Sequence, residues 1–245
     1  MTKLLDEVLE AHGGLERWRA VGEIRARVRS GGLLLATRAP SELVADYRLT
    51  IRLDEPWARI EPAGRSERAI FDAGAVRLED ASGAVIESRD DPRPFFFGRS
   101  GLRRNFRWDP LDLAYFAGYA MWNYMTTPLL LTRDEVEVRE GAAWTAPDGE
   151  TWRPLEARFD PALDTHSPEQ TFWIGPDGLI CRHDYTADVV GAWAKAAHAL
   201  AKHREFGGLI FPTSRRVTPR GVANRALPYP ALVWLELSEI EVDAG

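Results

Sequence analysis

The sequence predicts a mainly β protein with some α-helix, built on antiparallel strands. Short segments that alternate apolar and polar residues recur along most of the chain, separated by Gly, Pro and Asp turns. That alternation is typical of strands with one face in a core, and the close spacing favours a meander over βαβ units. Two other segments have helical character, one at the N-terminus and one in the middle.

The first expected element is a helix. Thr2 is a suitable N-cap, and Gly13-Gly14 ends the segment because glycine tolerates the left-handed conformation of a helix end. One apolar stripe recurs at helical spacing: Leu4, Leu5, Val8, Leu9 and His12. The following residues, 15–21, are expected to form a short turn.

Residues 23–31 then alternate strictly, with Ile24, Ala26 and Val28 on one face and three arginines on the other. The same alternation predicts further strands in this half of the chain, and Ala81–Ala84 is a hairpin signal between the last two. These strands are expected in the segments 33–38, 42–54, 57–62, 67–72, 75–80 and 84–89.

The middle of the chain departs from this pattern. Residues 90–110 hold three prolines, three consecutive phenylalanines and five arginines, and are expected to form a long loop. Asp109 and Pro110 predict a helix start, and Pro128 marks the end of that helix. Because residues 111–125 are apolar nearly all round, we expect this helix to be buried.

Strands are expected again in the second half, with turn signals at 146–150 and 175–179. The Ala-rich segment 192–203 is expected to be a helix between two strands. The predicted strands occupy 129–140, 151–160, 170–176, 179–187, 209–220 and 231–242. No composition shift marks a linker, so we expect one domain over residues 1–245.

Composition excludes several classes of protein. The formal net charge of −6 argues against a general nucleic-acid binder. The single cysteine, Cys181, cannot form an internal disulfide. Acidic residues interrupt the first apolar stripe, so no signal peptide is expected and the protein is predicted to be cytoplasmic. The apolar run 113–125 is too short to span a membrane.

Two stretches resemble a known family. Residues 10–21 (EAHGGLERWRAV) and 203–217 (HREFGGLIFPTSRRV) are similar to segments of the LolA/LolB-like superfamily of bacterial lipoprotein carriers. The resemblance implies a strongly curved, open half-barrel that wraps the N-terminal and central helices around an apolar cavity. It implies no catalytic residues. The carriers need an export signal or an anchoring cysteine, which we do not find, so a pocket for another apolar molecule is expected.

A metal site is not expected, and neither is a cofactor. His198 and His203 lie five positions apart, about 140° around a helix, and no HxH, HExxH or CxxC pattern occurs. The chain also lacks GxGxxG, GxxxxGK and GxSxG motifs, so nucleotide-binding and serine-hydrolase functions have no support.

An acid–base site is a candidate on residues 179–187. On a strand, His183 and Tyr185 share a face with Cys181, whereas Arg182 and Asp184 share the other. His183 is a candidate base, Tyr185 a candidate proton donor, and His203 begins a nearby segment. The alternative is that His183 is a hydrogen-bonded structural residue and that Arg182 and Asp184 form a solvated face.

The central helix supplies a candidate apolar wall, and arginines supply candidate head-group ligands. The wall residues are Tyr115, Phe116, Tyr119, Trp122 and Tyr124. Arg104, in the arginine group 99–107, and Arg215, beside Arg216, could hold a carboxylate or phosphate. The alternatives are ordinary core packing for the helix and a solvated loop for the arginines.

These candidates leave three functions open. The first is binding of a hydrophobic or amphipathic small molecule in a cavity between the sheet and the central helix. The second is a cofactor-free acid–base enzyme, such as a cyclase or isomerase, acting on an apolar metabolite there. The third is a packed scaffold that binds another protein through its Arg-rich loop. Ligand identity and oligomeric state stay open.

Overall fold

The computed structural model describes residues 2–146 and 149–244. Its strands follow one another along the chain in two groups. The first group is β1 (Val21–Gly31), β2 (Asp46–Arg52), β3 (Trp57–Pro62), β4 (Arg68–Asp72), β5 (Ala75–Glu79) and β6 (Val85–Asp90). The second is β7 (Val136–Glu140), β8 (Trp144–Thr145), β9 (Thr151–Phe159), β10 (Glu169–Ile174), β11 (Ile180–Thr186), β12 (Lys195–Phe206), β13 (Leu209–Pro219) and β14 (Val233–Ala244).

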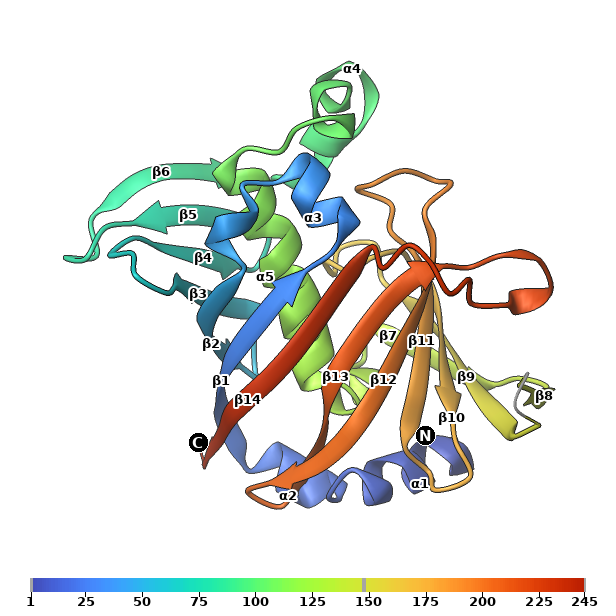
Figure 1. Cartoon of the computed structure of the whole chain (residues 1–245). Helices are drawn as coiled ribbons and strands as arrows, with labels where there is room; N and C mark the ends of the chain where they lie inside the picture. Colours follow the sequence, from blue (N-terminus) through green and yellow to red (C-terminus); the bar gives the residue numbers. More distant parts are fainter. Residues whose placement is uncertain (1, 147–148, 245) are drawn as a thin grey trace.

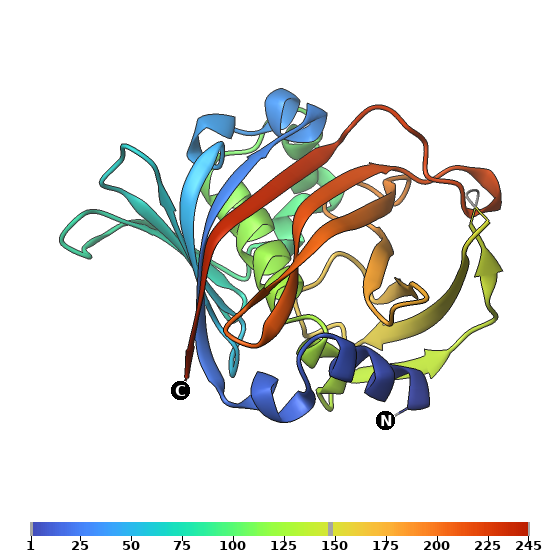
Figure 2. The same cartoon turned by 60° about the horizontal axis from the view of Figure 1, so that its bottom comes forward.

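These strands make one antiparallel, 14-stranded sheet in the order β6-β5-β4-β3-β2-β1-β14-β13-β12-β11-β10-β9-β7, with β8 paired to β9. The sheet does not close, and it curves into the open half-barrel that the sequence resemblance implied (Figure 2). The pairing of β1 with β14 joins the two groups in the middle of the sheet.

Five α-helices are described: α1 (Lys3–Ala11), α2 (Leu15–Arg19), α3 (Leu33–Arg38), α4 (Gly98–Gly101) and α5 (Pro110–Thr126). Short 3-10 turns occur at η1 (Ser41–Leu43), η2 (Arg93–Phe96), η3 (Arg103–Asn105), η4 (Leu129–Thr132) and η5 (Val222–Asn224). Figure 1 shows α5 inside the curve of the sheet, α1 and α2 across one end, and α3 and α4 at the opposite end. Within the described residues, no helix has the length and apolar character needed to cross a bilayer.

The central helix α5 begins with a complete capping box. Asp109 accepts a hydrogen bond from the Asp112 backbone N–H at 2.8 Å, and Asp112 accepts one from the Asp109 N–H at 3.1 Å. Every residue from Leu111 to Thr126 is buried. At Gly118 the helix approaches β4 so closely that an added Cβ would collide with the Phe71 side chain.

The two stretches that resemble the carrier family lie against each other. The helix α1 is capped by Thr2, as predicted, and ends at the Gly13-Gly14 pair. An added Cβ at Gly13 would collide with the carbonyl of Gly208 in the β12–β13 hairpin. The Arg17 side chain donates to the Gly207 carbonyl at 2.7 Å, and Ile210 N donates to His12 O at 3.2 Å. The start of the chain is therefore fastened to a hairpin near its end.

Several local predictions were wrong. Residues 33–38 form the helix α3 instead of a strand, and its Leu33 and Leu34 N–H groups donate to the carbonyls of Ala231 and Leu232. The Ala-rich segment forms the strand β12 instead of a helix, because it pairs with β11 and β13 along its length. That pairing outweighs the intrinsic preference of alanine for helix.

Smaller differences concern connections. Residues 15–19 form the short helix α2, 129–132 form a 3-10 turn before β7, and the loop 90–110 contains three short helical turns. The turn predicted at 175–179 is present, with Gly175 N donating to Leu179 O at 2.9 Å. The turn predicted at 146–150 includes residues 147 and 148, which lie outside the described residues.

Candidate functional site

A buried group of polar and aromatic side chains fills the concave side of the sheet beside the second half of α5. We call it the inner polar cluster. Its members come from α5, from the loop before β10, and from β11, β12 and β13: Tyr119, Tyr124, His166, His183, Tyr185, His198 and Arg215. All seven residues are buried.

Hydrogen bonds join the tyrosines of this cluster to His166. The Tyr124 hydroxyl lies 2.6 Å from His166 Nε2 and 3.0 Å from the Tyr185 hydroxyl. The Tyr119 hydroxyl lies 3.3 Å from His166 Nδ1. The His166 ring also stacks on Tyr185 with 3.9 Å between ring centroids. This part of the cluster therefore satisfies its own polar atoms, as buried polar groups require.

The tautomer of His183 follows from its neighbour Gln170. The Gln170 amide nitrogen donates to the Ser167 carbonyl at 2.8 Å, which directs the amide oxygen to His183 Nε2 at 2.6 Å. His183 Nε2 therefore donates a proton to Gln170. The ring also stacks on Phe172 at 4.2 Å, so its orientation is held by both contacts.

The polar atoms of Arg215 are less well satisfied than those of the tyrosines and His166. Its side chain is 4% exposed, donates from Nη2 to the Tyr124 carbonyl at 2.9 Å, and lies over the Tyr124 ring. Among the described residues no acidic side chain forms an ion pair with it, and its Nε has no hydrogen-bond partner. Burial lowers the pKa of Arg215 to about 10, which still leaves it charged at neutral pH.

His198 is the second unsatisfied group. It is 0% exposed, and neither ring nitrogen has a hydrogen-bond partner within the described part of the chain. It pairs in register with His183 on the neighbouring strand, with 5.9 Å between the two ring centroids. A buried imidazole without partners costs free energy, so the hydrogen-bonding capacity of the cluster is not fully satisfied.

Burial sets the charge of the cluster. It lowers the pKa of His166 to about 3 and holds the pKa values of His183 and His198 well below 6.5. It raises the pKa of Tyr124 to about 12, and the pKa of Tyr185 is also raised by burial. The histidines and tyrosines are therefore neutral at neutral pH, and the cluster has the single positive charge of Arg215.

A small cavity separates part of this cluster from the end of α1. It is about 10 Å³ and is lined by His12, Tyr124, Thr127, Phe172, Ile180, His183, Leu200, Pro212 and Arg215. That volume is at the lower limit for one water molecule. A guest larger than one water molecule therefore has to displace side chains or α1 at this cavity. A second pocket of about 100 Å³ lies between the start of α5 and β3, β4 and β5, and its lining includes Ile60, Leu78 and Leu113.

The structure brings five of the predicted site residues together: Tyr119, Tyr124, His183, Tyr185 and Arg215. His203 lies outside the cluster, 6.2 Å between ring centroids from His12, and its Nε2 is 3.1 Å from the Ile180 carbonyl. The Phe116 ring borders the cluster, with 5.8 Å between ring centroids to Tyr119 and 6.1 Å to His166.

The remaining predicted residues lie in other places. Arg104 is buried beside the start of α5, where its Nε donates to Asp112 at 2.6 Å. The Tyr115 hydroxyl donates to Asp164 at 2.5 Å and accepts from the Arg93 guanidinium at 3.3 Å.

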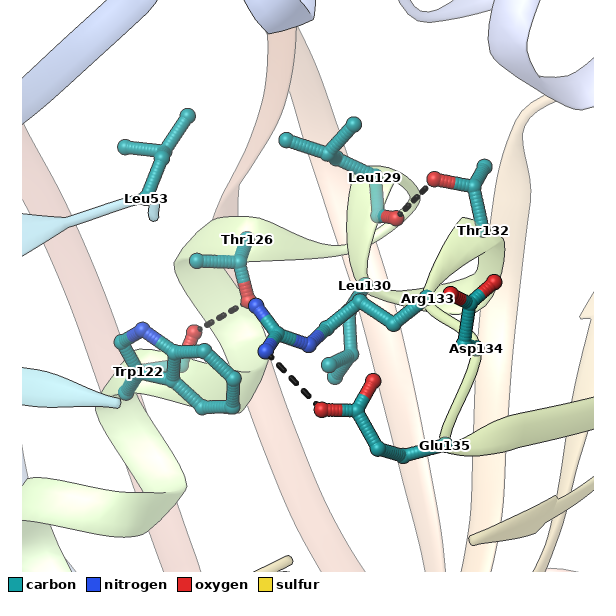
Figure 3. A pocket seen from close by; sticks show the side chains of 9 residues that line it. All are labelled: Leu53, Trp122, Thr126, Leu129, Leu130, Thr132, Arg133, Asp134 and Glu135. Carbon is teal, nitrogen blue, oxygen red and sulfur yellow. Dashed lines mark hydrogen bonds and ion pairs between the residues drawn. The ribbon is translucent and has the colours of Figure 1, made fainter. Parts of the chain in front are cut away.

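Trp122 lines a different pocket, on the outside of the C-terminal end of α5 (Figure 3). This pocket is about 420 Å³ and is lined by Leu53, Trp122, Thr126, Leu129, Leu130, Thr132, Arg133, Asp134 and Glu135. Its cation is compensated, because Arg133 forms an ion pair with Glu135 at 3.1 Å. Arg133 also lies over the Trp122 ring at 5.8 Å. The pocket therefore offers no unbalanced charge comparable to Arg215.

The expected solvated face of β11 is buried. Arg182 and Asp184 form an ion pair at 2.6 Å, and the Trp173 indole donates to Asp184 at 2.8 Å. The Arg182 guanidinium lies 5.7 Å from the Trp144 ring centroid. The alternative of a solvated Arg182–Asp184 face is therefore wrong, because tryptophans cover that face of the sheet.

Sequence reasoning missed two members of the inner polar cluster, His166 and His198, and the neighbouring Gln170. His198 was placed on an expected helix; the strand alternation Ala196, His198, Leu200 would have placed it beside His183. His166 lies in a loop that has no periodicity, so no local signal identifies it.

The described residues contain no group of three or more His, Cys, Asp or Glu side chains able to hold a metal ion.

Comparisons with known proteins support the fold. No family model matches the sequence, and no curated protein matches it. Among solved structures, a DUF1329 family protein from Desulfovibrio piger is similar over 99% of this chain and 92% of its own, with 12% identity and a TM-score of 0.54. A LolA superfamily protein from Nitrosomonas europaea is similar over 98% and 92%, with 11% identity and a TM-score of 0.54. The chain therefore has a LolA/LolB-like fold.

Proposed function

We propose that this protein binds an amphipathic small molecule with an acidic head group inside the half-barrel. The head group would be held by Arg215, and the apolar part would lie against the aromatic side chains that α5 and β10 present to the concave side. The observation that favours this function is the buried guanidinium of Arg215, which has no acidic partner among the described residues.

The buried charge of Arg215 lowers the stability of the protein in the absence of a ligand. An isolated buried cation is unfavourable unless a counter-charge or several hydrogen bonds compensate it. The neutral histidines and tyrosines around Arg215 supply only partial compensation. A carboxylate on a ligand would pair with the guanidinium in a bidentate manner, and the unpartnered nitrogens of His198 would then lie close to a polar group.

The apolar part of the ligand is supported by the lining of the small cavity and by the fold. Phe172, Ile180 and Leu200 line the cavity together with the Tyr124 ring. The sequence resemblance to lipoprotein carriers points in the same direction. Because the cavity is about 10 Å³, binding requires a movement, and α1 is the element that covers it through His12.

The Gly13-Gly14 pair offers a hinge for that movement. Gly13 has a φ of +111° and Gly14 a φ of +86°, conformations in which only glycine is unstrained. A swing of α1 about this pair would expose Arg215 and the apolar lining without unpairing any strand of the sheet. It would break the contacts that fasten α1, namely the hydrogen bond from Ile210 N to His12 O and the ion pair of Glu7 with Arg153. The cytoplasmic location expected from the sequence remains a prediction, which cell fractionation would check.

The acid–base enzyme has weaker support. A general base works best with a pKa close to the working pH, whereas burial holds the pKa of His183 well below 6.5. Its Nε2 proton is also committed to Gln170. The arrangement therefore favours binding over proton transfer at His183.

The test combines extraction with a matched pair of probes. The protein purified from cells is analysed by native mass spectrometry, and anything bound is extracted and identified. Binding of dodecanoate and of dodecanol, which differ only in the charged head group, is then measured by calorimetry. We expect wild type to prefer the acid, and Arg215→Gln to lose that preference.

Arg216→Gln is the matched control, because Arg216 is the next residue on β13 and is exposed on the other face of the sheet. It should retain the preference for the acid. Equal binding of acid and alcohol by wild type, or loss of the preference in both variants alike, would contradict an acidic head group at Arg215.

A further inference from the structure

The end of the half-barrel opposite α1 is formed by four segments, residues 33–38, 93–107, 187–194 and 220–232, which we call the rim (Figure 1). Hydrogen bonds join them. Leu33 N donates to Ala231 O at 3.0 Å, and the Arg38 side chain donates to Val190 O at 3.4 Å. Arg93 forms an ion pair with Asp188 at 3.7 Å. Segments far apart in the sequence are therefore held together at this end of the half-barrel.

Exposed apolar side chains are concentrated on this rim. Eleven large hydrophobic side chains are exposed among the described residues, and nine of them belong to the rim: Leu33, Phe95, Phe97, Leu102, Phe106, Trp193, Val222, Leu227 and Tyr229. Phe106, Trp193 and Tyr229 are 79%, 72% and 76% exposed and come from three different segments. Such a concentration marks an interaction surface, because scattered single residues are the ordinary case.

The charge of the rim is opposite to that of the rest of the protein. Its four segments contain eight arginines and one acidic residue, Asp188, which is a formal charge of +7. Since the formal net charge of the whole chain is −6, the residues outside these segments have a formal net charge of −13. Three aspartates just outside these segments, Asp109, Asp112 and Asp184, pair with rim arginines and lower the net charge at this end. Arg99, Arg107 and Arg225 are exposed and form no ion pair with any described residue.

We infer that the rim docks on the surface of a lipid bilayer that contains anionic phospholipids. Tryptophan, tyrosine and phenylalanine favour the boundary between headgroups and acyl chains, and arginine pairs with lipid phosphates. The acidic remainder of the protein would be repelled by the same membrane, so the charge distribution orients the rim toward it. This inference goes beyond the proposed ligand binding and does not depend on it.

A bilayer fits the exposed side chains of the rim better than nucleic acid does. They stand on loops and short helical turns and include the aliphatic residues Leu33, Leu102, Val222 and Leu227. Bases of single-stranded nucleic acid stack on aromatic rings, whereas aliphatic side chains enter the acyl boundary of a bilayer. Each arginine near an anionic surface strengthens binding on the order of fivefold, so the three unpaired ones together give roughly a hundredfold.

The test is flotation of the full chain with vesicles, either of pure phosphatidylcholine or of phosphatidylcholine mixed with phosphatidylglycerol. We expect binding to the mixed vesicles only, and weaker binding as salt screens the charges. Two variants probe the rim. Arg99→Gln/Arg107→Gln/Arg225→Gln should lower the affinity roughly a hundredfold, and Phe106→Ser/Trp193→Ser/Tyr229→Ser should abolish flotation.

Two controls use exposed residues away from the rim: Val85→Ser/Ile86→Ser on β6, and Arg139→Gln on β7. Both should float as wild type does, and so should Arg215→Gln. Thermal unfolding checks that the rim variants remain folded. No flotation with the mixed vesicles overturns the inference, as does an affinity that either rim variant leaves at the wild-type value. Tight binding to a single-stranded oligonucleotide without vesicle binding also overturns it.

Discussion

The guanidinium of Arg215 lies over the ring of Tyr124, 4.9 Å from its centroid, and donates to the Tyr124 carbonyl at 2.9 Å. This contact joins β13 to the C-terminal half of α5. It is the main compensation for a charge that has no acidic partner among the described residues. A cation over an aromatic ring and one hydrogen bond offset part of the cost of burial.

Removing that charge should therefore stabilise the fold. Lowering a pKa from 12.5 to about 10 corresponds to roughly 3 kcal/mol against the charged form. Arg215→Met keeps the apolar stem and loses the hydrogen bond, so we expect its free energy of unfolding to rise by about 1–2 kcal/mol. Urea unfolding measures this, with Arg216→Met as the exposed control. A marked loss of stability in Arg215→Met would argue that the charge is compensated after all.

Acid should destabilise the protein at pH values well above those at which carboxylates titrate. Burial lowers the pKa of His12 to about 4 and of His166 to about 3, and it also lowers the pKa values of His183, His198 and His203. The unfolded chain takes up protons near pH 6.5 and the folded chain does not, so stability is complete above that pH and falls below it.

At pH 5 each histidine whose pKa is strongly lowered should reduce the free energy of unfolding by about 2 kcal/mol. Asp164 and Asp188 act in the opposite direction, because burial raises their pKa values. Urea unfolding at several pH values between 7.5 and 5 measures the net slope. Stability that stays level over this range would show that the histidines are accessible to protons in the folded protein.

The Tyr124 hydroxyl should contribute more to the stability of the protein than the size of a single oxygen atom suggests. Tyr124→Phe deletes one oxygen and leaves both His166 Nε2 and the Tyr185 hydroxyl without that partner. We expect a loss of about 1–3 kcal/mol of unfolding free energy, the usual cost of an unsatisfied buried polar group. Tyr229→Phe on the exposed rim is the control and should leave thermal unfolding unchanged. Equal effects of the two substitutions would be inconsistent with the hydrogen bonds described.

Because α5 and β4 are in such close contact, we expect Gly118→Ala to change stability in the direction opposite to that indicated by helix propensity. Alanine is the better helix former, by about 1 kcal/mol relative to glycine. Gly118→Ala should nevertheless destabilise the protein by about 1–3 kcal/mol, because the new methyl group collides with Phe71. Adding Phe71→Ala should make Gly118→Ala less harmful, which a double-mutant cycle of urea unfolding measures. Simple additivity of the two changes would contradict the close approach.

The sequence predicted the parts of the fold that depend on local patterns. Strict alternation identified β1, the Asp109-Pro110 pair identified the start of α5, and Gly13-Gly14 identified the end of α1. These signals work because side-chain periodicity and capping act within a few residues of the chain. The half-barrel itself was implied by the family resemblance, and the antiparallel sheet confirms it.

Local preference was misleading where distant strands supplied stronger interactions. Residues 195–206 are rich in alanine, yet they lie between β11 and β13, and two ladders of hydrogen bonds hold them extended. The charged face of β11 was misjudged for the same reason. Only the assembled sheet brings Trp144 and Trp173 over Arg182 and Asp184.

For the candidate site, the sequence by itself determined which residue types were present, and it singled out His183, Tyr185, Tyr124 and Arg215. The tertiary structure decided which of them meet. It placed His166 against Tyr124 and His198 beside His183, and it directed Arg104 to Asp112 instead. Burial and long-range pairing set these contacts and the pKa values that follow from them. Both depend on residues far apart in the chain, whereas the periodicity that predicted the elements is local.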